Sequence, residues 1–465
     1  MRSVGRYIIR GLLGRGAMGK VFRVELPPIG KIGALKLLAP DPLLGTLMGY
    51  ERIRETFLKE AVTVAGLRHT NIISIHDFDE DQGRPFYVMN FHAHNLGALM
   101  GETYRMEMPS RVLSADKALD YLDQTLAGLC CLHDAGILHR DIKPFNLLIT
   151  DQDTVKICDF GLSALRGEKY SGPANLNVGS PYYAAPEQEA DPGSIDARAD
   201  LYPLGIMFYR MLTGHLPDFD NELSAYLPPS RQNPDLDTHW DQFTARSLAR
   251  RPEQRFASAD AMRSELDQLR DHWHRQKEKS CAWVHNVSDP WDEETPSDHL
   301  KPRSRPIKWS PERAAVEMDL DSLWRPRTYR VNRFRHQGPD TITDGLAGLT
   351  WQQSGSKYPQ TWHQAHHYIA RLNAQRFGGC QNWRLPTMDE LITLLKPPSQ
   401  GRDMCIEPLF DATQRWIWSA DRRSFIAAYF ADIELGFVGW QDFSAPFYVR
   451  AVCSMKPIDL GFVQK

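Results

Sequence analysis

A short polar stretch between hydrophobic runs most constrains what this chain can fold into. Residues 139–146 read His-Arg-Asp-Ile-Lys-Pro-Phe-Asn, and residues 159–161 read Asp-Phe-Gly. The flanking runs at 136–138, 147–149 and 155–158 predict short buried strands that present polar residues at their ends. We therefore expect a rigid hairpin that displays a defined set of charged side chains.

These side chains have the chemistry of phosphoryl transfer. Asp141 can accept a proton from an incoming hydroxyl, and Lys143 can lie near the transferring phosphoryl group. Asn146 and Asp159 offer oxygen atoms that can hold a divalent metal over the phosphates of ATP. Phosphoryl transfer depends mostly on positioning and on charge neutralisation, and this set supplies both. An accidental solvated loop is a poor alternative, because four residue types occur at fixed spacing and Asp-Phe-Gly follows them.

The stretch resembles the catalytic core of protein kinases, and Lys143, two places after Asp141, is typical of the serine/threonine branch. The resemblance covers about residues 5 to 271, and we set the domain at 1–271. It implies a bilobal protein-kinase fold of the α+β class, with ATP and Mg²⁺ or Mn²⁺ as cofactors. It also implies that proteins are the substrates.

A glycine-rich loop lies between two predicted strands near the N-terminus. Its glycines are Gly14, Gly16 and Gly19, and Val21 begins the returning strand. Such a pattern alone is weak evidence. Its place between two strands, and not at the start of a helix, favours a kinase phosphate flap over a dinucleotide-binding turn. By resemblance, these four residues bind ATP.

One lysine, Lys36, interrupts a buried-strand pattern. An unpaired buried ammonium is costly, so this side chain should pair or reach solvent, as an edge-strand lysine would. By resemblance, Lys36 grips the α and β phosphates and pairs with a glutamate of the next helix. The family's usual distance to the Arg-His-Thr-Asn-Ile-Ile run at 68–73 favours Glu60, with Glu55 as the competitor and Glu51 less favoured.

The strand predicted over residues 85–92 resembles the segment that binds adenine through its backbone. Met89 takes the gatekeeper position, and Phe91 follows in the hinge. A methionine here also serves as core filler, and the two roles are compatible.

The segment between Asp159 and Glu187 resembles a kinase activation segment. Ser180 stands where a threonine usually contacts Asp141 and Lys143, so we expect it in the substrate-docking loop. The segment contains no threonine, the usual phosphoryl acceptor. Ser171 is therefore our hypothesis for the activating phosphorylation site, and a constitutively ordered loop is an equal alternative.

Three charged residues have structural roles by resemblance. Asp200 anchors the backbone of the catalytic loop, and Glu187 forms a buried ion pair with Arg255. Breaking such a pair leaves a lone buried charge and costs about 3–5 kcal/mol.

Residues 272–332 differ in character from what precedes them. Prolines recur at positions 290, 296, 302, 306, 311 and 326, and charges of both signs alternate. The pattern predicts a linker that is extended and partly disordered. Its tryptophans, among them Trp283, Trp291, Trp309 and Trp324, are unusual for a disordered segment and suggest that parts of it dock onto a neighbouring domain.

A second globular domain is predicted over 333–456, followed by a tail at 457–465. Its short strands, two helices and many tryptophans predict a small α+β fold. The motifs Gly-Leu-Thr-Trp, Trp-Arg-Leu-Pro-Thr, Trp-Ser and Val-Arg-Ala-Val resemble the Lcl C-terminal domain, also called DUF1566, which is C-type-lectin-like in fold. The resemblance implies a domain that binds a ligand or a protein partner.

A histidine group in this domain raises the question of a metal site. His363 and His367 lie four residues apart on a predicted helix, which is the spacing that zinc-binding helices use, and His366 lies beside them. No third ligand is evident from the sequence. A solvated or stacked helix face is the favoured interpretation.

Composition excludes several classes of protein. A net charge of −3 argues against a nucleic-acid partner bound by bulk electrostatics. Seven cysteines, two of them adjacent, indicate a reduced chain. No apolar stretch approaches the ~18 residues needed to span a bilayer, so we expect a cytoplasmic protein without a membrane span.

The sequence therefore predicts a serine/threonine protein kinase that transfers the γ-phosphoryl group of ATP to protein hydroxyls. Its C-terminal domain would bind a ligand or partner. The alternative is a kinase-fold scaffold whose C-terminal domain carries the function. The complete set of Lys36, Asp141, Asn146 and Asp159 favours the enzyme.

Overall fold

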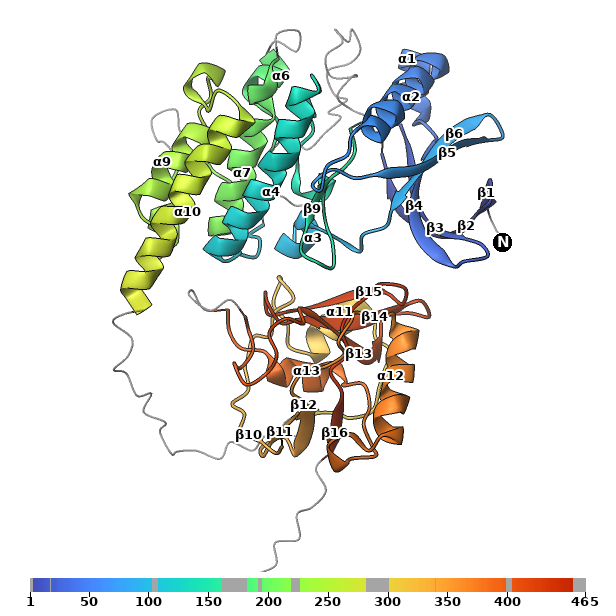
Figure 1. The fold of residues 1–465 in the computed structure, drawn as a ribbon, viewed down its shortest axis with the longest axis vertical. Coiled ribbons are helices and arrows are strands. Elements are labelled where there is room, and N and C mark those ends of the chain that lie inside the picture. Colours follow the sequence, from blue (N-terminus) through green and yellow to red (C-terminus); the bar gives the residue numbers. More distant parts are fainter. Residues whose placement is uncertain are drawn as a thin grey trace, which may run out of the picture. The chain divides into compact units, whose positions relative to one another are not determined.

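The computed structural model describes residues 3–16, 18–102, 108–160, 182–190, 195–218, 226–281, 301–338, 340–398 and 404–454. The chain divides into two compact units, residues 1–287 and 288–465 (Figure 1). Unit 1 has a strand-rich N-terminal part and a helical remainder, and the described part of unit 2 combines two sheets with three α-helices.

The N-terminal part of unit 1 is an antiparallel sheet in the order β1-β2-β3-β4-β6-β5. The strands are β1 (Ser3–Val4), β2 (Tyr7–Arg15), β3 (Gly19–Leu26), β4 (Lys31–Leu38), β5 (Ile75–Asp81) and β6 (Arg84–Asn90). Helices α1 (Pro42–Met48) and α2 (Tyr50–Gly66) connect β4 to β5. Helix α2 buries one apolar stripe against the sheet, with the Phe57 ring 5.2 Å from that of Tyr87. Glu60 is the one charged member of that stripe.

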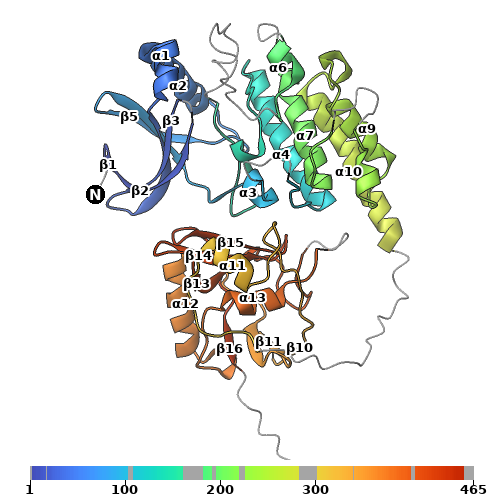
Figure 2. The ribbon, with the colours of Figure 1, turned by 180° about the vertical axis from the view of Figure 1, so that it is seen from behind.

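The helical part of unit 1 is built around α7 (Leu201–Thr213), whose residues are all buried. Around it lie α3 (Leu96–Met100), α4 (Ala115–Asp134), α6 (Pro186–Ala190), α8 (Pro229–Gln232), α9 (Thr238–Ser247) and α10 (Ala259–Cys281). A small sheet has the order β7-β8-β9, and its strands are β7 (His94–Asn95), β8 (Leu147–Ile149) and β9 (Val155–Ile157). Strands β8 and β9 belong to residues 139–159, which we call the catalytic hairpin. Figure 2 shows the same helices from behind.

The first domain was predicted to end at residue 271, but helix α10 continues beyond this point to Cys281. Its second half packs on other helices of unit 1. The Trp273 ring lies edge-on to that of Trp240, with 5.6 Å between centroids, and Lys277 forms an ion pair with Asp116 of α4. Contacts of this kind fix a helix that charge alternation alone suggested to be linker.

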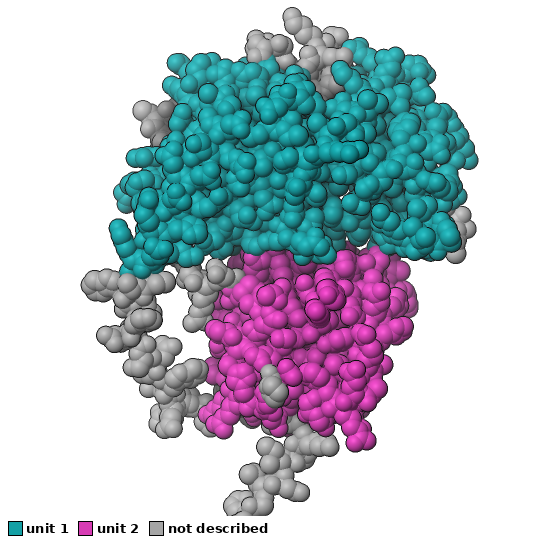
Figure 3. Space-filling view, in the orientation of Figure 1, with its two compact units in different colours: residues 1–287 teal, residues 288–465 magenta. Residues whose placement is uncertain are grey.

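Unit 2 is drawn in magenta in Figure 3. One antiparallel sheet has the order β10-β11-β12-β16, and its strands are β10 (Phe334–His336), β11 (Thr341–Asp344), β12 (Leu349–Gln352) and β16 (Val452–Ser454). The other is the meander of β13 (Trp416–Arg422), β14 (Ala427–Asp432) and β15 (Phe437–Asp442). The helices are α11 (Pro311–Glu317), α12 (Trp362–Ala374) and α13 (Met388–Leu394).

The predicted linker is also corrected at its C-terminal end, because residues 301–332 belong to unit 2. Ala314, Met318 and Leu320 are buried in the core of that unit, and Trp309 and Trp324 pack against it. Pro311 occupies the first turn of α11, where the missing amide hydrogen costs nothing. The docking that the tryptophans suggested therefore occurs within unit 2. Residues 282–300 of the predicted linker lie outside the described residues.

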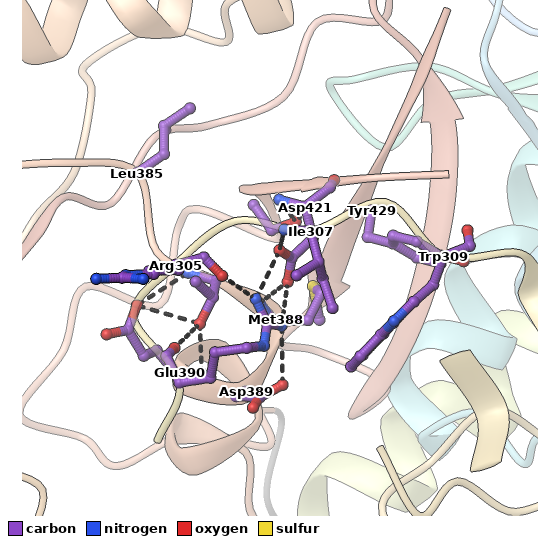
Figure 4. Close-up of polar contacts among 12 residues, drawn as sticks. Arg305, Ile307, Trp309, Leu385, Met388, Asp389, Glu390, Asp421 and Tyr429 are labelled. Atoms are coloured by element: carbon purple, nitrogen blue, oxygen red, sulfur yellow. Dashed lines mark hydrogen bonds and ion pairs between the residues drawn. The ribbon is translucent and has the colours of Figure 1, made fainter. Parts of the chain in front are cut away.

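A buried carboxylate, Asp421, ties this N-terminal segment to the rest of unit 2 (Figure 4). It accepts hydrogen bonds from the backbone amides of Ile307 and Met388, each at 2.8 Å. It also forms an ion pair with Arg303, whose Nη2 lies 2.8 Å from Oδ2. The Tyr429 hydroxyl donates to the carbonyl of Trp309 at 3.1 Å. These contacts lie on three separate parts of the chain, so the segment is integral to the domain.

We expect Leu320→Ala to destabilise unit 2. Leu320 is 4% exposed in the core of the unit, and its truncation should cost about 2–5 kcal/mol through lost burial and the cavity left behind. Hydrogen exchange of the β13–β15 amides measures the opening of this unit without a contribution from unit 1.

The matched control is Val316→Ala on the neighbouring helix, since Val316 is 79% exposed. This variant should change the free energy of unfolding by no more than about 0.5 kcal/mol. Equal protection of the amides in both variants would show that residues 301–332 do not support the core.

Candidate active site

Lys36 lies at the centre of strand β4, opposite Val21 of β3 in the sheet register. Its Nζ is 2.8 Å from Oε1 of Glu60 on α2, and the same oxygen accepts a hydrogen bond from the Tyr87 hydroxyl at 2.9 Å. The other candidate glutamates of α2, Glu51 and Glu55, are exposed. The structure therefore pairs Lys36 with Glu60.

A second carboxylate meets the same ammonium. Nζ of Lys36 lies 2.7 Å from Oδ1 of Asp159, a residue 123 positions later in the chain. Burial alone would lower the pKa of Lys36, but the charges of Asp159 and Glu60 hold it well above its ordinary value. The Lys36 ammonium in turn lowers the pKa of Asp159. Lysine and aspartate are therefore both charged.

The catalytic hairpin places two polar side chains beside the carboxylate of Asp141. Nζ of Lys143 and Nδ2 of Asn146 lie 2.9 Å and 3.2 Å from Oδ2 of Asp141. Asn146 also donates to the backbone carbonyl of Asp141 at 2.8 Å, and this bond closes the loop on itself. Asp141, Lys143 and Asn146 thus converge as the sequence spacing suggested.

Asp200 at the start of α7 holds the backbone of this hairpin. Its buried carboxylate accepts from the amides of His139 at 2.9 Å and Arg140 at 2.6 Å, and from the His133 ring at 2.9 Å. Arg140 has a φ of 62°, a left-handed conformation that non-glycine residues rarely adopt. The bond to Asp200 helps to stabilise this backbone conformation.

The glycine-rich loop joins β2 to β3, and the Gly16 amide bonds to the Gly19 carbonyl at 2.9 Å. A Cβ on Gly14 or Gly16 would meet nothing within 4 Å, so both face open space. Gly19 differs, because its Cβ would lie 2.3 Å from the Leu37 carbonyl oxygen. Packing of β3 on β4 therefore requires a glycine at that position.

Met89 lies near the C-terminal end of β6, where it is half-buried and packs against the core beneath α2. Phe91 follows directly after the strand and is also half-buried. Both residues lie on the segment that leaves the sheet for the helical part of unit 1.

Gly161 and the residues up to 181, including Ser171 and Ser180, lie outside the described residues. Beyond them, Arg255 and Glu187 form a two-pronged ion pair, with N–O distances of 2.6 Å and 2.8 Å. Gln188 on the same helix, α6, donates to the Arg140 carbonyl at 2.9 Å. The end of the activation segment is thus bonded to the catalytic hairpin.

Sequence reasoning missed one buried polar group, formed by Arg210, Glu102 and Tyr183. Arg210 Nε lies 3.3 Å from Oε1 of Glu102, and the Tyr183 hydroxyl donates to the same oxygen. Arg210 interrupts the otherwise apolar run of α7. A lone arginine in such a helix requires a buried partner, and this signal could have been recognised.

The oxygen atoms present fit a hard divalent cation. Both hydrogen bonds of the Asn146 side chain come from its amide nitrogen, which leaves the amide oxygen available. Asp159 uses Oδ1 for Lys36, and its side chain is 42% exposed. An ionised carboxylate and an amide oxygen are ligands that Mg²⁺ accepts. The open space over Gly14 and Gly16 is equally compatible with a bound nucleotide.

Two histidines of α12, His363 and His366, lie against aromatic rings of unit 2. The ring of His366 lies 4.3 Å from that of Trp362, edge to face, and the ring of His363 lies 5.3 Å from that of Phe443. Within the described ranges, no third ligand joins these histidines. The same ranges contain no helix that is both long and apolar enough for a bilayer crossing.

Comparison with known proteins assigns the two units. The protein kinase domain family matches residues 7–266, more than half of the chain, and the Lcl C-terminal domain matches residues 340–453. The chain belongs to the protein kinase family. Its kinase domain coincides with the part of unit 1 that carries the site described above, and unit 2 carries the Lcl C-terminal domain.

Curated relatives are bacterial kinases. The serine/threonine-protein kinase PksC of Streptomyces coelicolor is 38% identical over 278 residues, which are 56% of this chain and 48% of PksC. The serine/threonine-protein kinase pkn3 of Myxococcus xanthus is 32% identical over 281 residues, with 56% and 49% covered. The chain thus spans about half the length of these relatives. A solved structure, the PknI kinase domain of Mycobacterium tuberculosis, aligns with a TM-score of 0.43 and 26% identity over 57% of this chain and 97% of that one.

We expect Asp200→Asn to destabilise the kinase unit in a pH-dependent way. Burial raises the pKa of Asp200, but the hydrogen bond from His133, the nearby histidines and the Arg140 amide outweigh it, so the folded pKa lies below its ordinary value. The ionised group therefore contributes stability above about pH 4, and this contribution is lost as the pH falls through the folded pKa.

At pH 7 the variant should lower the free energy of unfolding by roughly 1.5–3 kcal/mol, the range for hydrogen bonds to a charged group. The difference from the parent protein should shrink below about pH 4. Denaturant unfolding at several pH values measures it. Asp134→Asn, at an exposed site on α4, is the control and should change little. A difference in unfolding free energy that persists at low pH would contradict the stabilising role of the ionised Asp200 carboxylate.

Proposed function

We propose that this protein is an ATP-dependent serine/threonine protein kinase that transfers the γ-phosphoryl group to hydroxyls of protein substrates. The observation that carries the proposal is the assembly of Lys36, Glu60 and Asp159 beside the Asp141 hairpin. A pseudokinase used only as a scaffold has no need to preserve both the buried ion pair and the catalytic carboxylate.

Asp141 is proposed as the group that takes the proton from the acceptor hydroxyl. Its carboxylate already lies 2.9 Å from the Lys143 ammonium, so a cation stands beside the base. In this role Lys143 stabilises the negative charge that gathers around the reacting oxygens. The hydrogen bond from Asn146 orients this carboxylate, and Asp200 anchors the backbone of the preceding residue, Arg140. Pre-organisation of this kind is the main contribution that a kinase fold makes to the reaction.

Lys36 is proposed to bind the α and β phosphates of ATP, since it is a charged, pre-oriented ammonium at the edge of the glycine loop. Gly14, Gly16, Gly19 and Val21 would cover the nucleotide, while Met89 and Phe91 would flank its adenine. Asn146 and Asp159 would hold Mg²⁺ or Mn²⁺. When bound, the cation neutralises phosphate charge.

The remaining assignments rest on sequence and on the relatives together. Ser171 is proposed as an activating phosphorylation site and Ser180 as a substrate-docking residue. The Lcl C-terminal domain is proposed to bind a ligand or protein that directs or controls the kinase unit. No nucleic-acid partner is proposed.

We expect Asp141→Asn to remove phosphoryl transfer while leaving ATP binding intact. Loss of a general base lowers rates by about 10²–10⁴-fold, and the amide keeps the size of the side chain. Purified protein incubated with ATP and Mg²⁺, followed by phosphosite mapping by mass spectrometry, measures autophosphorylation.

Asp151→Asn is the matched control, because Asp151 is exposed at the turn between β8 and β9. Its phosphorylation should equal that of the parent protein. If Asp141→Asn is phosphorylated as much as the parent protein, Asp141 does not act as the base in the reaction. Absence of ATP binding in the parent protein would favour the scaffold alternative.

We expect Ser171→Ala to lower peptide phosphorylation severalfold if phosphate on this serine orders the activation segment. The same mass spectrometry should find phosphate on Ser171 in the parent protein. Ser163→Ala, in the same segment, serves as the control. Full activity of Ser171→Ala with an unmodified segment would show that the segment needs no such switch.

A further inference from the structure

Unit 1 carries a second group of metal-ligand side chains, outside the kinase active site. Asp237 lies at the start of α9, His239 follows two residues later, and His272 comes from α10, 35 residues beyond Asp237. The ligand atoms of the three residues all lie within 4.8 Å of one another. Two imidazoles and one carboxylate form a donor set typical of zinc sites.

The rings of His239 and His272 both contact the carboxylate of Asp237. Nε2 of His272 is 2.6 Å from Oδ2 of Asp237, and Nδ1 of His239 is 3.3 Å from the same oxygen. A tetrahedral zinc with bonds of ~2.0–2.1 Å separates its ligand atoms by roughly 3.4 Å. The His239 contact already has this separation, and the His272 contact requires a movement of less than about 1 Å.

The two histidine rings also lie close to each other. The two imidazole rings are stacked, with 3.8 Å between their centroids. One cation could therefore contact both rings and the carboxylate, since their ligand atoms all lie within 4.8 Å of one another.

The surrounding structure holds the three ligands in place. Oδ1 of Asp237 caps α9 by accepting from the His239 amide at 3.0 Å, which leaves Oδ2 for a cation. The rings of Trp240 and Trp273, each adjacent in sequence to one of the histidines, contact each other 5.6 Å apart. Trp240 is fully buried, so the two helices meet on a rigid apolar base. The two helices that carry the ligands are therefore fixed relative to each other before a metal binds, which lowers the entropic cost of binding.

We propose that Asp237, His239 and His272 form a Zn²⁺ site, with water as the fourth ligand, that ties the start of α9 to α10. Zn²⁺ would replace the hydrogen bonds that the two rings now make to Oδ2 of Asp237, and a proton displaced from a ring nitrogen would leave to solvent. The site would stabilise the helix from which the chain leaves the kinase unit. It is independent of phosphoryl transfer, since none of its residues belongs to the active site.

The test uses the full chain without an affinity tag, in excess Mg²⁺ so that the kinase site is occupied by magnesium. Zn²⁺ is titrated in competition with a chromophoric chelator, and Co²⁺ absorption reports nitrogen ligation. His272→Gln and Asp237→Asn each remove one ligand, and the asparagine can still cap α9. We expect one Zn²⁺ per chain in the parent protein, with affinity at least about tenfold weaker in each variant. Zinc should also raise the Tm of the parent protein and not that of the variants.

His274→Gln is the matched control, because His274 is exposed on the same helix and is not a member of the group. It should bind zinc like the parent protein. Circular dichroism of each variant without metal shows whether its fold is intact. No stoichiometric zinc in the parent protein, or undiminished binding in folded His272→Gln, would overturn the proposal.

Discussion

The buried ammonium of Lys36 is the constraint on which the kinase unit depends. A lysine in the middle of a sheet is tolerated only when carboxylates compensate its charge, and here Glu60 and Asp159 do so at 2.8 Å and 2.7 Å. One carboxylate comes from helix α2 and the other from the segment after β9. Satisfying one charge therefore sets the position of a helix and of a catalytic loop relative to the same strand.

A second buried charge acts in the same way on the other side of the active site. Asp200 binds two consecutive amides of the hairpin and the ring of His133, so the central helix α7, the hairpin and α4 meet at one carboxylate. The unusual backbone conformation of Arg140 occurs at this junction. Lys36 and Asp200 together explain how side chains from distant parts of the sequence reach one site.

Much of this site could be predicted from the sequence because the residues that perform chemistry occur in short, ordered motifs. Lys36 is recognisable as a charge in an apolar strand, and the resemblance to the kinase family favours Glu60 over Glu55. Arg210 and its partner Glu102 were not foreseen, because their pairing depends on helices far apart in the chain. The start of the second domain could not be predicted either. Prolines and alternating charges at 301–332 resemble a linker, and only tertiary packing shows that Met318 and Leu320 fill a core.

That packing has a consequence for how such domains can be exchanged between proteins during evolution. The matched Lcl C-terminal domain begins at residue 340, yet Ala314, Met318 and Leu320 complete the core of unit 2. A recombination event that joined a new partner at residue 340 would leave behind these apolar side chains and the arginine that pairs with Asp421. The smallest portable module in this protein therefore extends about forty residues further toward the N-terminus than the family motif, beginning near residue 301.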